Sequence, residues 1–125
     1  MDDAIDLVSR FCAAWPTSSA AELAAWFTDD AVYHNIPIDP VTGKEAIEAT
    51  IAGFSSLADH LEFEVLNIAG SGNVVLTERI DHFHRAAGVI DLPVMGTFEV
   101  RDGKIAAWRD YFDLQQFMSQ ANPPA

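Results

Sequence analysis

The spacing of hydrophobic residues changes once along this 125-residue chain, near Leu57, and that change limits the folds available to it. Before Leu57, apolar residues recur every three or four positions, which is typical of amphipathic helices. After it, apolar and polar residues alternate, which is typical of half-buried strands. Helices followed by an antiparallel meander predict an α+β domain whose helices pack on one face of a curved sheet. In so short a chain, we expect a cone that encloses an apolar pocket.

Three helices are predicted before Leu57. The spacing of apolar residues places the first helix over residues 3–15. The capping boxes Ser19-Ala-Ala-Glu22 and Thr42-Gly-Lys-Glu45 predict the starts of the second and third helices, because each pairs a hydroxyl with a carboxylate three positions later. Residues 31–35 predict a short strand between these two helices, and Pro37 ends it.

Four strands are predicted after Leu57, from residue 61 onward and over residues 74–85, 89–100 and 105–112. The last two are joined by Asp102-Gly103, a strong hairpin signal. Asp113 is placed to cap a short final helix that runs to Met118, and we expect a loose tail from about residue 121. The chain has no repeat or linker, so residues 1–125 are expected to form a single domain.

Composition excludes several classes of partner. Nineteen acidic and seven basic residues give a net charge of −12, which repels nucleic acid and favours a neutral substrate. No apolar run approaches the ~20 residues of a membrane span, so we expect no membrane contact. The acidic start Met1-Asp2-Asp3 is unlike a signal peptide and predicts a cytoplasmic protein. The single cysteine, Cys12, rules out internal disulfides and is interpreted as a packing residue.

One carboxylate is predicted on an otherwise apolar strand face. Because side chains alternate across a strand, Asp110 shares a face with Trp108 and Phe112. The preceding strand offers a matching apolar face, made by Ile90, Leu92, Val94, Gly96 and Phe98. We assign both faces to the interior. A lone buried carboxylate costs several kcal/mol, so Asp110 is expected to be protonated or paired.

The strand over residues 74–85 supplies a partner for Asp110. Arg79 and Asp81 share a face with Thr77 and Phe83, where an inner strand would ordinarily have Val and Leu. A guanidinium can bridge two carboxylates with its forked donors, hold them apart and reduce their repulsion. The alternative is a purely structural ion-pair cluster at the rim of the cone.

Tyr33 and Asn35 share a face of the first strand, and each can donate and accept hydrogen bonds. Together they can fix the orientation of a water molecule beside a carboxylate. In the alternative interpretation, Tyr33 packs in the core and Asn35 caps the turn before Pro37.

Three motifs together resemble the limonene-1,2-epoxide hydrolase family: Tyr33-His-Asn35 near Ile36-Pro37, Glu78-Arg79-Ile80-Asp81, and Trp108-Arg109-Asp110-Tyr111-Phe112-Asp113. Their order and separations are similar to that family over essentially the whole chain. The resemblance implies the cystatin-like cone fold shared with nuclear transport factor 2 and SnoaL-type cyclases. It also implies a homodimer that uses neither a metal nor an organic cofactor.

The resemblance further implies a role for each matching residue. Asp110 would be the general base that deprotonates water, and Tyr33 and Asn35 would orient that water. Asp81 would be the general acid that protonates the epoxide oxygen, and Arg79 would bridge the two acids. The substrate would be a neutral terpene-like or cyclic epoxide, converted to a vicinal diol. Its expected apolar contacts, which ordinary core packing would also explain, are Trp108, Phe112, Phe83, Leu92, Val94 and Phe117.

Several alternatives stay open at this point. An aspartate could attack the epoxide carbon directly and form an ester. A cone-fold isomerase or cyclase, of the ketosteroid isomerase or SnoaL kind, would use one aspartate base, and a non-catalytic domain would only bind a ligand. His82 and His84 share the face opposite Asp81, but no third metal ligand is evident there, so no metal is expected. We expect this outer face, which also holds Arg109 and Tyr111, to form the dimer contact.

Overall fold

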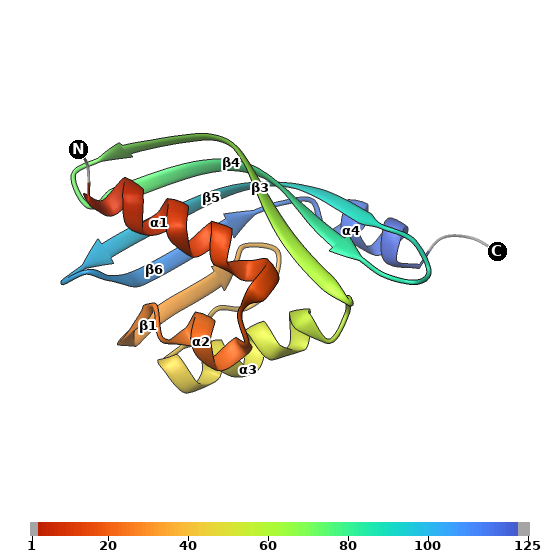
Figure 1. Cartoon of the computed structure of the whole chain (residues 1–125), viewed down its shortest axis with the longest axis horizontal. Helices are drawn as coiled ribbons and strands as arrows, with labels where there is room; N and C mark the ends of the chain where they lie inside the picture. The colour runs from red at the N-terminus through yellow and green to blue at the C-terminus, as the bar shows by residue number, and fades with distance from the viewer. Residues whose placement is uncertain (1–2, 123–125) are drawn as a thin grey trace.

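A computed structural model of the chain describes residues 3–122 (Figure 1). The elements are α1 (Asp3–Ala14), the 3-10 helix η1 (Trp15–Thr17), α2 (Ala20–Ala24), β1 (Phe27–Asn35), β2 (Val41–Thr42), α3 (Lys44–Ser55), β3 (His60–Ser71), β4 (Val74–His84), β5 (Ile90–Arg101), β6 (Lys104–Tyr111) and α4 (Leu114–Ala121). No helix within the described range is long and apolar enough to cross a membrane.

The six strands form one curved sheet in the order β2-β1-β6-β5-β4-β3. Every neighbouring pair is antiparallel except β1 and β6, which run parallel. Helix α1 lies across β3 and β4, α3 packs on β1 and β2, and α4 packs on β5 at the far end of the sheet (Figure 1). The predicted α+β cone, with helices on a curved sheet, is confirmed.

Local signals account for some of the helix boundaries. The capping box at the start of α2 is present: Ser19 Oγ accepts from the Glu22 N–H, and the Glu22 carboxylate accepts from the Ser19 N–H. The second predicted capping box is wrong, because α3 begins after Gly43 without a side-chain cap. Thr42 instead pairs with Val32 in the β1–β2 ladder, and Gly43 has a φ of 97°.

The ends of the strands follow their turn chemistry. Asp102 and Gly103 both have positive φ, at 52° and 75°, as a tight hairpin turn requires.

Asp113 caps α4 by accepting from the Gln116 N–H, as predicted, and the helix runs to Ala121 rather than Met118. The predicted loose tail lies mostly outside the described residues. Strand β1 begins at Phe27, four residues before the predicted start, because Phe27 pairs with Ile105 of β6.

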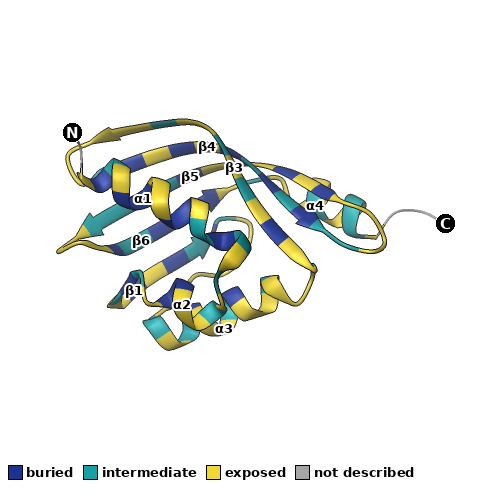
Figure 2. Cartoon of the chain, in the orientation of Figure 1, coloured by how far each residue is buried: buried dark blue, intermediate teal, exposed yellow. Residues whose placement is uncertain are grey.

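Burial alternates along the central strands (Figure 2). On β4 the inner residues are buried: Val75, Thr77, Arg79, Asp81 and Phe83. The predicted inner face of β5 is buried as well, from Ile90 to Phe98. Aromatic rings from β1, β5 and β6 pack edge to face around Phe11 of α1 in the hydrophobic core. Cys12 is buried beside them, as its packing interpretation predicted.

Candidate active site

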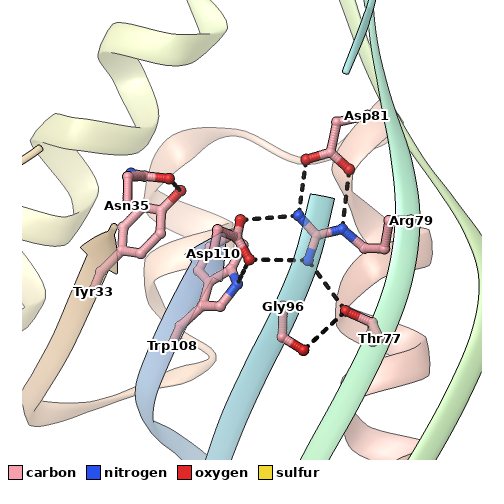
Figure 3. A network of polar contacts seen from close by, with 8 residues as sticks. All are labelled: Tyr33, Asn35, Thr77, Arg79, Asp81, Gly96, Trp108 and Asp110. Atoms are coloured by element: carbon pink, nitrogen blue, oxygen red, sulfur yellow. Dashed lines mark hydrogen bonds and ion pairs between the residues drawn. The ribbon is translucent and has the colours of Figure 1, made fainter. Parts of the chain in front are cut away.

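One guanidinium bridges two buried carboxylates on the inner face of the sheet (Figure 3). Arg79 Nε and Nη2 donate to the two oxygens of Asp81 at 3.0 and 2.8 Å. Arg79 Nη1 and Nη2 donate to the two oxygens of Asp110 at 3.1 and 2.9 Å. Nη1 also donates to Thr77 Oγ1 at 3.3 Å. All five N–H donors of the guanidinium are therefore engaged by the protein itself.

Gly96 makes the bridge possible. It lies on β5 between Thr77 of β4 and Asp110 of β6, so the Arg79 side chain crosses β5 above it. A Cβ atom at Gly96 would be 2.4 Å from Arg79 Nη1, 2.7 Å from Asp110 Oδ1 and 2.9 Å from Thr77 Oγ1. Only glycine leaves room for the three side chains. Sequence reasoning assigned Gly96 to the apolar face and missed this role, although a glycine inside a strand is itself a signal of close approach.

The parallel pairing of β1 with β6 brings Tyr33 and Asn35 to the same place. Tyr33 lies opposite Trp108, and Asn35 lies opposite Asp110. Both are buried, and the Tyr33 hydroxyl donates to Asn35 Oδ1 at 3.3 Å. The Asn35 side chain therefore does not cap the following turn, which is closed by a backbone hydrogen bond from Ile38. All five predicted catalytic residues lie together at the inner face of the sheet.

Trp108 was predicted to line the pocket, but it is not among the lining residues. It is fully buried, because Tyr33 stacks on its ring at a centroid distance of 4.2 Å and an angle of 7°. Its indole Nε1 donates to Asp110 Oδ1 at 2.6 Å (Figure 3). The spacing Trp-x-Asp puts both residues on one strand face, which was the available signal for this contact. Trp108 is thus a hydrogen-bond donor to the carboxylate rather than a wall residue.

An open apolar pocket of about 570 Å³, solvent at its mouth included, lies beside these groups. Both carboxylates, Tyr33 and Asn35 contribute to its wall. Five of the six predicted lining residues are there: Phe83, Leu92, Val94, Phe112 and Phe117. The lining residues that sequence reasoning missed are Trp15, Ile38, Phe54, Leu61, Phe63 and Leu114. All six lie on helices, in a loop or on the edge strand β3. There, tertiary packing decides which side chains reach the pocket.

Burial controls the protonation of the site. Burial raises the pKa of Asp81 to about 6, although the guanidinium of Arg79 acts in the opposite direction. Burial also raises the pKa of Tyr33 well above its usual range, so its hydroxyl remains a donor. For Arg79, burial would lower the pKa, but Asp110 and Asp81 outweigh it and the pKa rises. The site therefore combines a permanent cation with a carboxyl group that is protonated in weakly acidic solution.

Phe63 covers the guanidinium on the pocket side. The centre of the Arg79 guanidinium lies 4.5 Å from the centre of the Phe63 ring, and that ring stacks on Trp15 at 4.4 Å. Such a cation–π contact favours the charged guanidinium and excludes water from it. Arg79 is consequently 1% exposed, a value rare for arginine unless it is fully paired.

His82 and His84 lie on the opposite face of the sheet. His82 Nδ1 is 2.6 Å from Asp91, and its Nε2 is 2.8 Å from Glu64. His84 makes a longer contact of 3.4 Å with Glu62. Within residues 3–122, no three His, Cys, Asp or Glu side chains are grouped so that they could hold a metal ion.

Comparisons with known proteins find epoxide hydrolases among those similar to this chain. Epoxide hydrolase EphG of Mycobacterium tuberculosis (strain ATCC 25618 / H37Rv) is 34% identical over 86 residues, which are 69% of this chain. The match spans 57% of the length of that relative. The structure of an M. tuberculosis epoxide hydrolase, similar to limonene-epoxide hydrolase, has 30% identity and a TM-score of 0.78. That match covers 94% of this chain and 87% of the other.

More distant structures share the fold alone. A candidate SnoaL-like polyketide cyclase from Jannaschia sp. CCS1 has 18% identity and a TM-score of 0.86, and the match covers 98% of this chain and 94% of the other. A protein with a ketosteroid isomerase-like fold from Catenulispora acidiphila DSM 44928 has 20% identity and a TM-score of 0.84 over 95% of this chain and 94% of the other. Residues 2–122 match the limonene-1,2-epoxide hydrolase catalytic domain, and the chain belongs to that family.

Proposed function

We propose that this protein is an epoxide hydrolase that adds water to a neutral epoxide and releases a vicinal diol by one-step general acid–base catalysis. The observation that carries the proposal is the Arg79 bridge, which holds two buried carboxylates in the wall of an apolar pocket. Family membership supports the same reaction. Opening an unactivated epoxide needs a proton for oxygen and a nucleophile for carbon, and paired carboxyl groups in opposite protonation states supply both.

In the proposed step, the side chains of Asn35 and Tyr33 orient a water molecule beside Asp110. Asp110 takes one proton from the water as its oxygen bonds to an epoxide carbon. The bond from that carbon to the epoxide oxygen breaks, and Asp81 donates its proton to the released oxygen. The product is the diol, with Asp110 protonated and Asp81 ionised. Exchange of protons with solvent restores the starting state.

The proposed substrate is a neutral terpene-like or cyclic epoxide. The pocket wall away from the acids is made of aromatic and aliphatic side chains, such as Phe83, Leu92 and Phe117. These side chains offer no partner to a charged or strongly polar group, and the net charge of −12 disfavours an anion. All donors of Arg79 are occupied, so the described residues that line the pocket present no free cation to a carboxylate or phosphate.

The test is an assay of diol formation from limonene oxide and cyclohexene oxide. Asp81→Asn and Asp110→Asn should each lower kcat by about 10²–10⁴-fold, because each removes one proton-transfer group. Asp91→Asn, on the outer face, is the matched control and should stay within about twofold of wild type. A wild-type protein that forms no diol from any neutral epoxide would overturn the proposal. Turnover of an enolisable ketone would then favour an isomerase.

Labelled water separates the proposed step from direct attack by an aspartate. In a single turnover in H₂¹⁸O, the label should appear in the diol, because water itself bonds to carbon. If an aspartate formed an ester, the first turnover would place unlabelled oxygen in the diol and the label in Asp81 or Asp110. That result would replace the proposed step by a covalent one.

We also propose that two copies of this chain pair through the outer face of the sheet. Leu76, Met95 and Tyr111 lie there on β4, β5 and β6 and are 47, 50 and 47% exposed. Exposed apolar residues on adjacent strands are typical of an interaction surface. Analytical ultracentrifugation at micromolar concentration should show a dimer for wild type and a monomer for Met95→Glu. A monomeric wild type would contradict this proposal.

A further inference from the structure

We propose that Trp108 is a positioning residue that decides which of the two carboxyl groups carries the proton. Its indole N–H holds Asp110 in the ionised state and so leaves the proton on Asp81. This inference rests on the proposed general acid–base function, which needs the two acids in opposite and defined states. It concerns a residue that neither touches the pocket nor belongs to the bridge.

Arg79 cannot make this choice, because it treats the two acids alike. It gives two N–H groups to Asp81, at 3.0 and 2.8 Å, and two to Asp110, at 3.1 and 2.9 Å. The two aspartate side chains are also similarly buried, at 7% and 5% exposed. With the guanidinium alone, the proton would have no strong reason to prefer either acid.

Trp108 breaks this symmetry. Its Nε1 donates to Asp110 Oδ1 at 2.6 Å, which gives Asp110 a third donor. Among the described residues, Arg79 is the sole hydrogen-bond donor to Asp81. A donor stabilises the ionised form of a carboxyl group more than its protonated form, so the added N–H favours ionised Asp110. The raised pKa of Asp81, about 6, agrees with a proton that resides there.

The indole is held rigidly in place for this task. Its ring is stacked between Tyr33, at 4.2 Å, and Phe98, at 5.3 Å, and none of it is exposed. Indole N–H is a donor only, so its hydrogen bond cannot reverse when the acids exchange their proton. A hydroxyl in the same place could rotate and accept from protonated Asp110, and would stabilise both states.

Other charged or titratable groups near Asp110 do not provide the same bias. They come from three elements: Cys12 on α1, Tyr33 on β1, and Arg79 and Asp81 on β4. Burial raises the pKa of Cys12 to about 12 and that of Tyr33 well above its usual range. Both therefore stay neutral in weakly acidic and neutral solution, and neither adds a charge beside Asp110.

The test is the pH dependence of kcat/KM in Trp108→Phe, which keeps an aromatic ring but removes the N–H. The acidic limb reports protonation of the base, and the basic limb reports loss of the proton from the acid. We expect the acidic limb to move up by about one pH unit while the basic limb stays, so the active range narrows. We also expect kcat at the optimum to fall about twofold, because without the indole N–H the proton is shared about equally between Asp81 and Asp110.

Trp15→Phe is the matched control. Trp15 is also buried and stacked, but its N–H has no hydrogen-bond partner among residues 3–122. Because Trp15 lines the pocket, we expect its substitution to change the magnitude of kcat/KM, but both limbs of the pH profile should keep their wild-type midpoints. If Trp108→Phe lowers kcat without moving the acidic limb, Trp108 has only a packing role and the inference is wrong.

A shape-preserving variant covers the case in which Trp108→Phe does not fold. Replacing Trp108 with β-(3-benzothienyl)alanine exchanges the N–H for sulfur at nearly the same size, and it should give the same shift of the acidic limb. Carbon-13 NMR of the aspartate carboxyl groups, assigned with Asp81→Asn and Asp110→Asn, measures the protonation directly. At the same pH, it should show a larger protonated fraction of Asp110 in the variant than in wild type.

The NMR measurement also separates two kinds of failure. If wild type forms no diol, the proposed function fails, but the titration of Asp110 with and without the N–H still tests the role of Trp108. If wild type forms diol and the Asp110 titration does not change in the variant, the function stands and the inference on Trp108 falls.

Discussion

Strand β4 has an ionic cluster on each of its two faces, and the two clusters differ in burial rather than in distance. On the inner face, Arg79 contacts Asp81 and Asp110 with N···O distances of 2.8 and 2.9 Å. On the outer face, the neighbouring His82 contacts Glu64 and Asp91 at 2.8 and 2.6 Å. The inner side chains are 0, 7 and 5% exposed, whereas the outer ones are 19, 49 and 58% exposed.

The comparison teaches that burial, not contact distance, decides how strongly the charges of an ionic cluster depend on one another. Water screens the outer cluster, so its charges are easily replaced and contribute little to stability. Burial reduces the solvent screening of the inner cluster, so each charge depends on its partners, and burial raises the pKa of Asp81 to about 6. Removing a partner should therefore have large effects inside and small effects outside.

The largest effect is expected from Arg79→Met. It leaves two carboxylates buried without a cation, which should lower the free energy of unfolding by about 3–5 kcal/mol near neutral pH and abolish diol formation. Urea denaturation measures the loss. In an Asp81→Asn, Asp110→Asn background the same change should cost much less, because no charge is left unpaired. An equal loss in both backgrounds would contradict the account of the inner cluster.

A smaller but still large effect is expected from Gly96→Ala. The added methyl group meets Arg79, Asp110 and Thr77 at under 3.0 Å, so the bridge must shift. We expect a loss of about 1–3 kcal/mol in stability and a clear fall in kcat. Gly53→Ala in α3, with no atom within 4 Å, is the control and should stabilise by about 0.5–1 kcal/mol. Wild-type activity in Gly96→Ala would show that the bridge tolerates displacement.

The raised pKa of Asp81 should make the free energy of unfolding depend on pH. An unfolded aspartate has a pKa of about 3.9, whereas burial raises that of Asp81 to about 6. The native state binds this proton more tightly, so the contribution of Asp81 is most favourable below about pH 4 and declines as pH rises to about 6, by on the order of 1–3 kcal/mol. Urea denaturation of wild type and Asp81→Asn measures it. The difference in the free energy of unfolding between wild type and Asp81→Asn should decrease as pH rises. A difference that increases with pH would contradict the raised pKa of Asp81.

The smallest effect is expected from His82→Gln on the outer face. Hydrogen bonds to Asp91 and Glu64 raise the pKa of His82, so its stabilising effect is present below about pH 6.5 and is lost as pH rises through the higher native pKa. Thermal unfolding at about pH 6 should show a loss of at most about 1 kcal/mol, reduced by 1 M salt. A loss as large as that of Arg79→Met would erase the distinction between the two faces.

The side of the sheet on which each acid lies was predictable from the sequence. Arg79, Asp81 and Asp110 were assigned to the inner faces from alternation alone, because residues two apart on a strand point the same way. The capping box at Ser19 and the turn at Asp102-Gly103 were predictable for a similar reason, since both depend on neighbours within a few positions. The wrong capping box at Thr42 shows the limit, because pairing with another strand overrode the local motif.

By itself, the sequence determined the order of helices and strands and the polar inner face of β4. It also determined that Asp110 lies on an otherwise apolar strand face. Only the tertiary structure decided that β5 contributes a glycine where Arg79 crosses to Asp110, and that β1 runs parallel to β6 and brings Asn35 beside them. It also showed that Trp108, which was predicted to line the pocket, donates a hydrogen bond to Asp110. Periodicity specifies a face, whereas strand order and side-chain packing specify which atoms on that face meet.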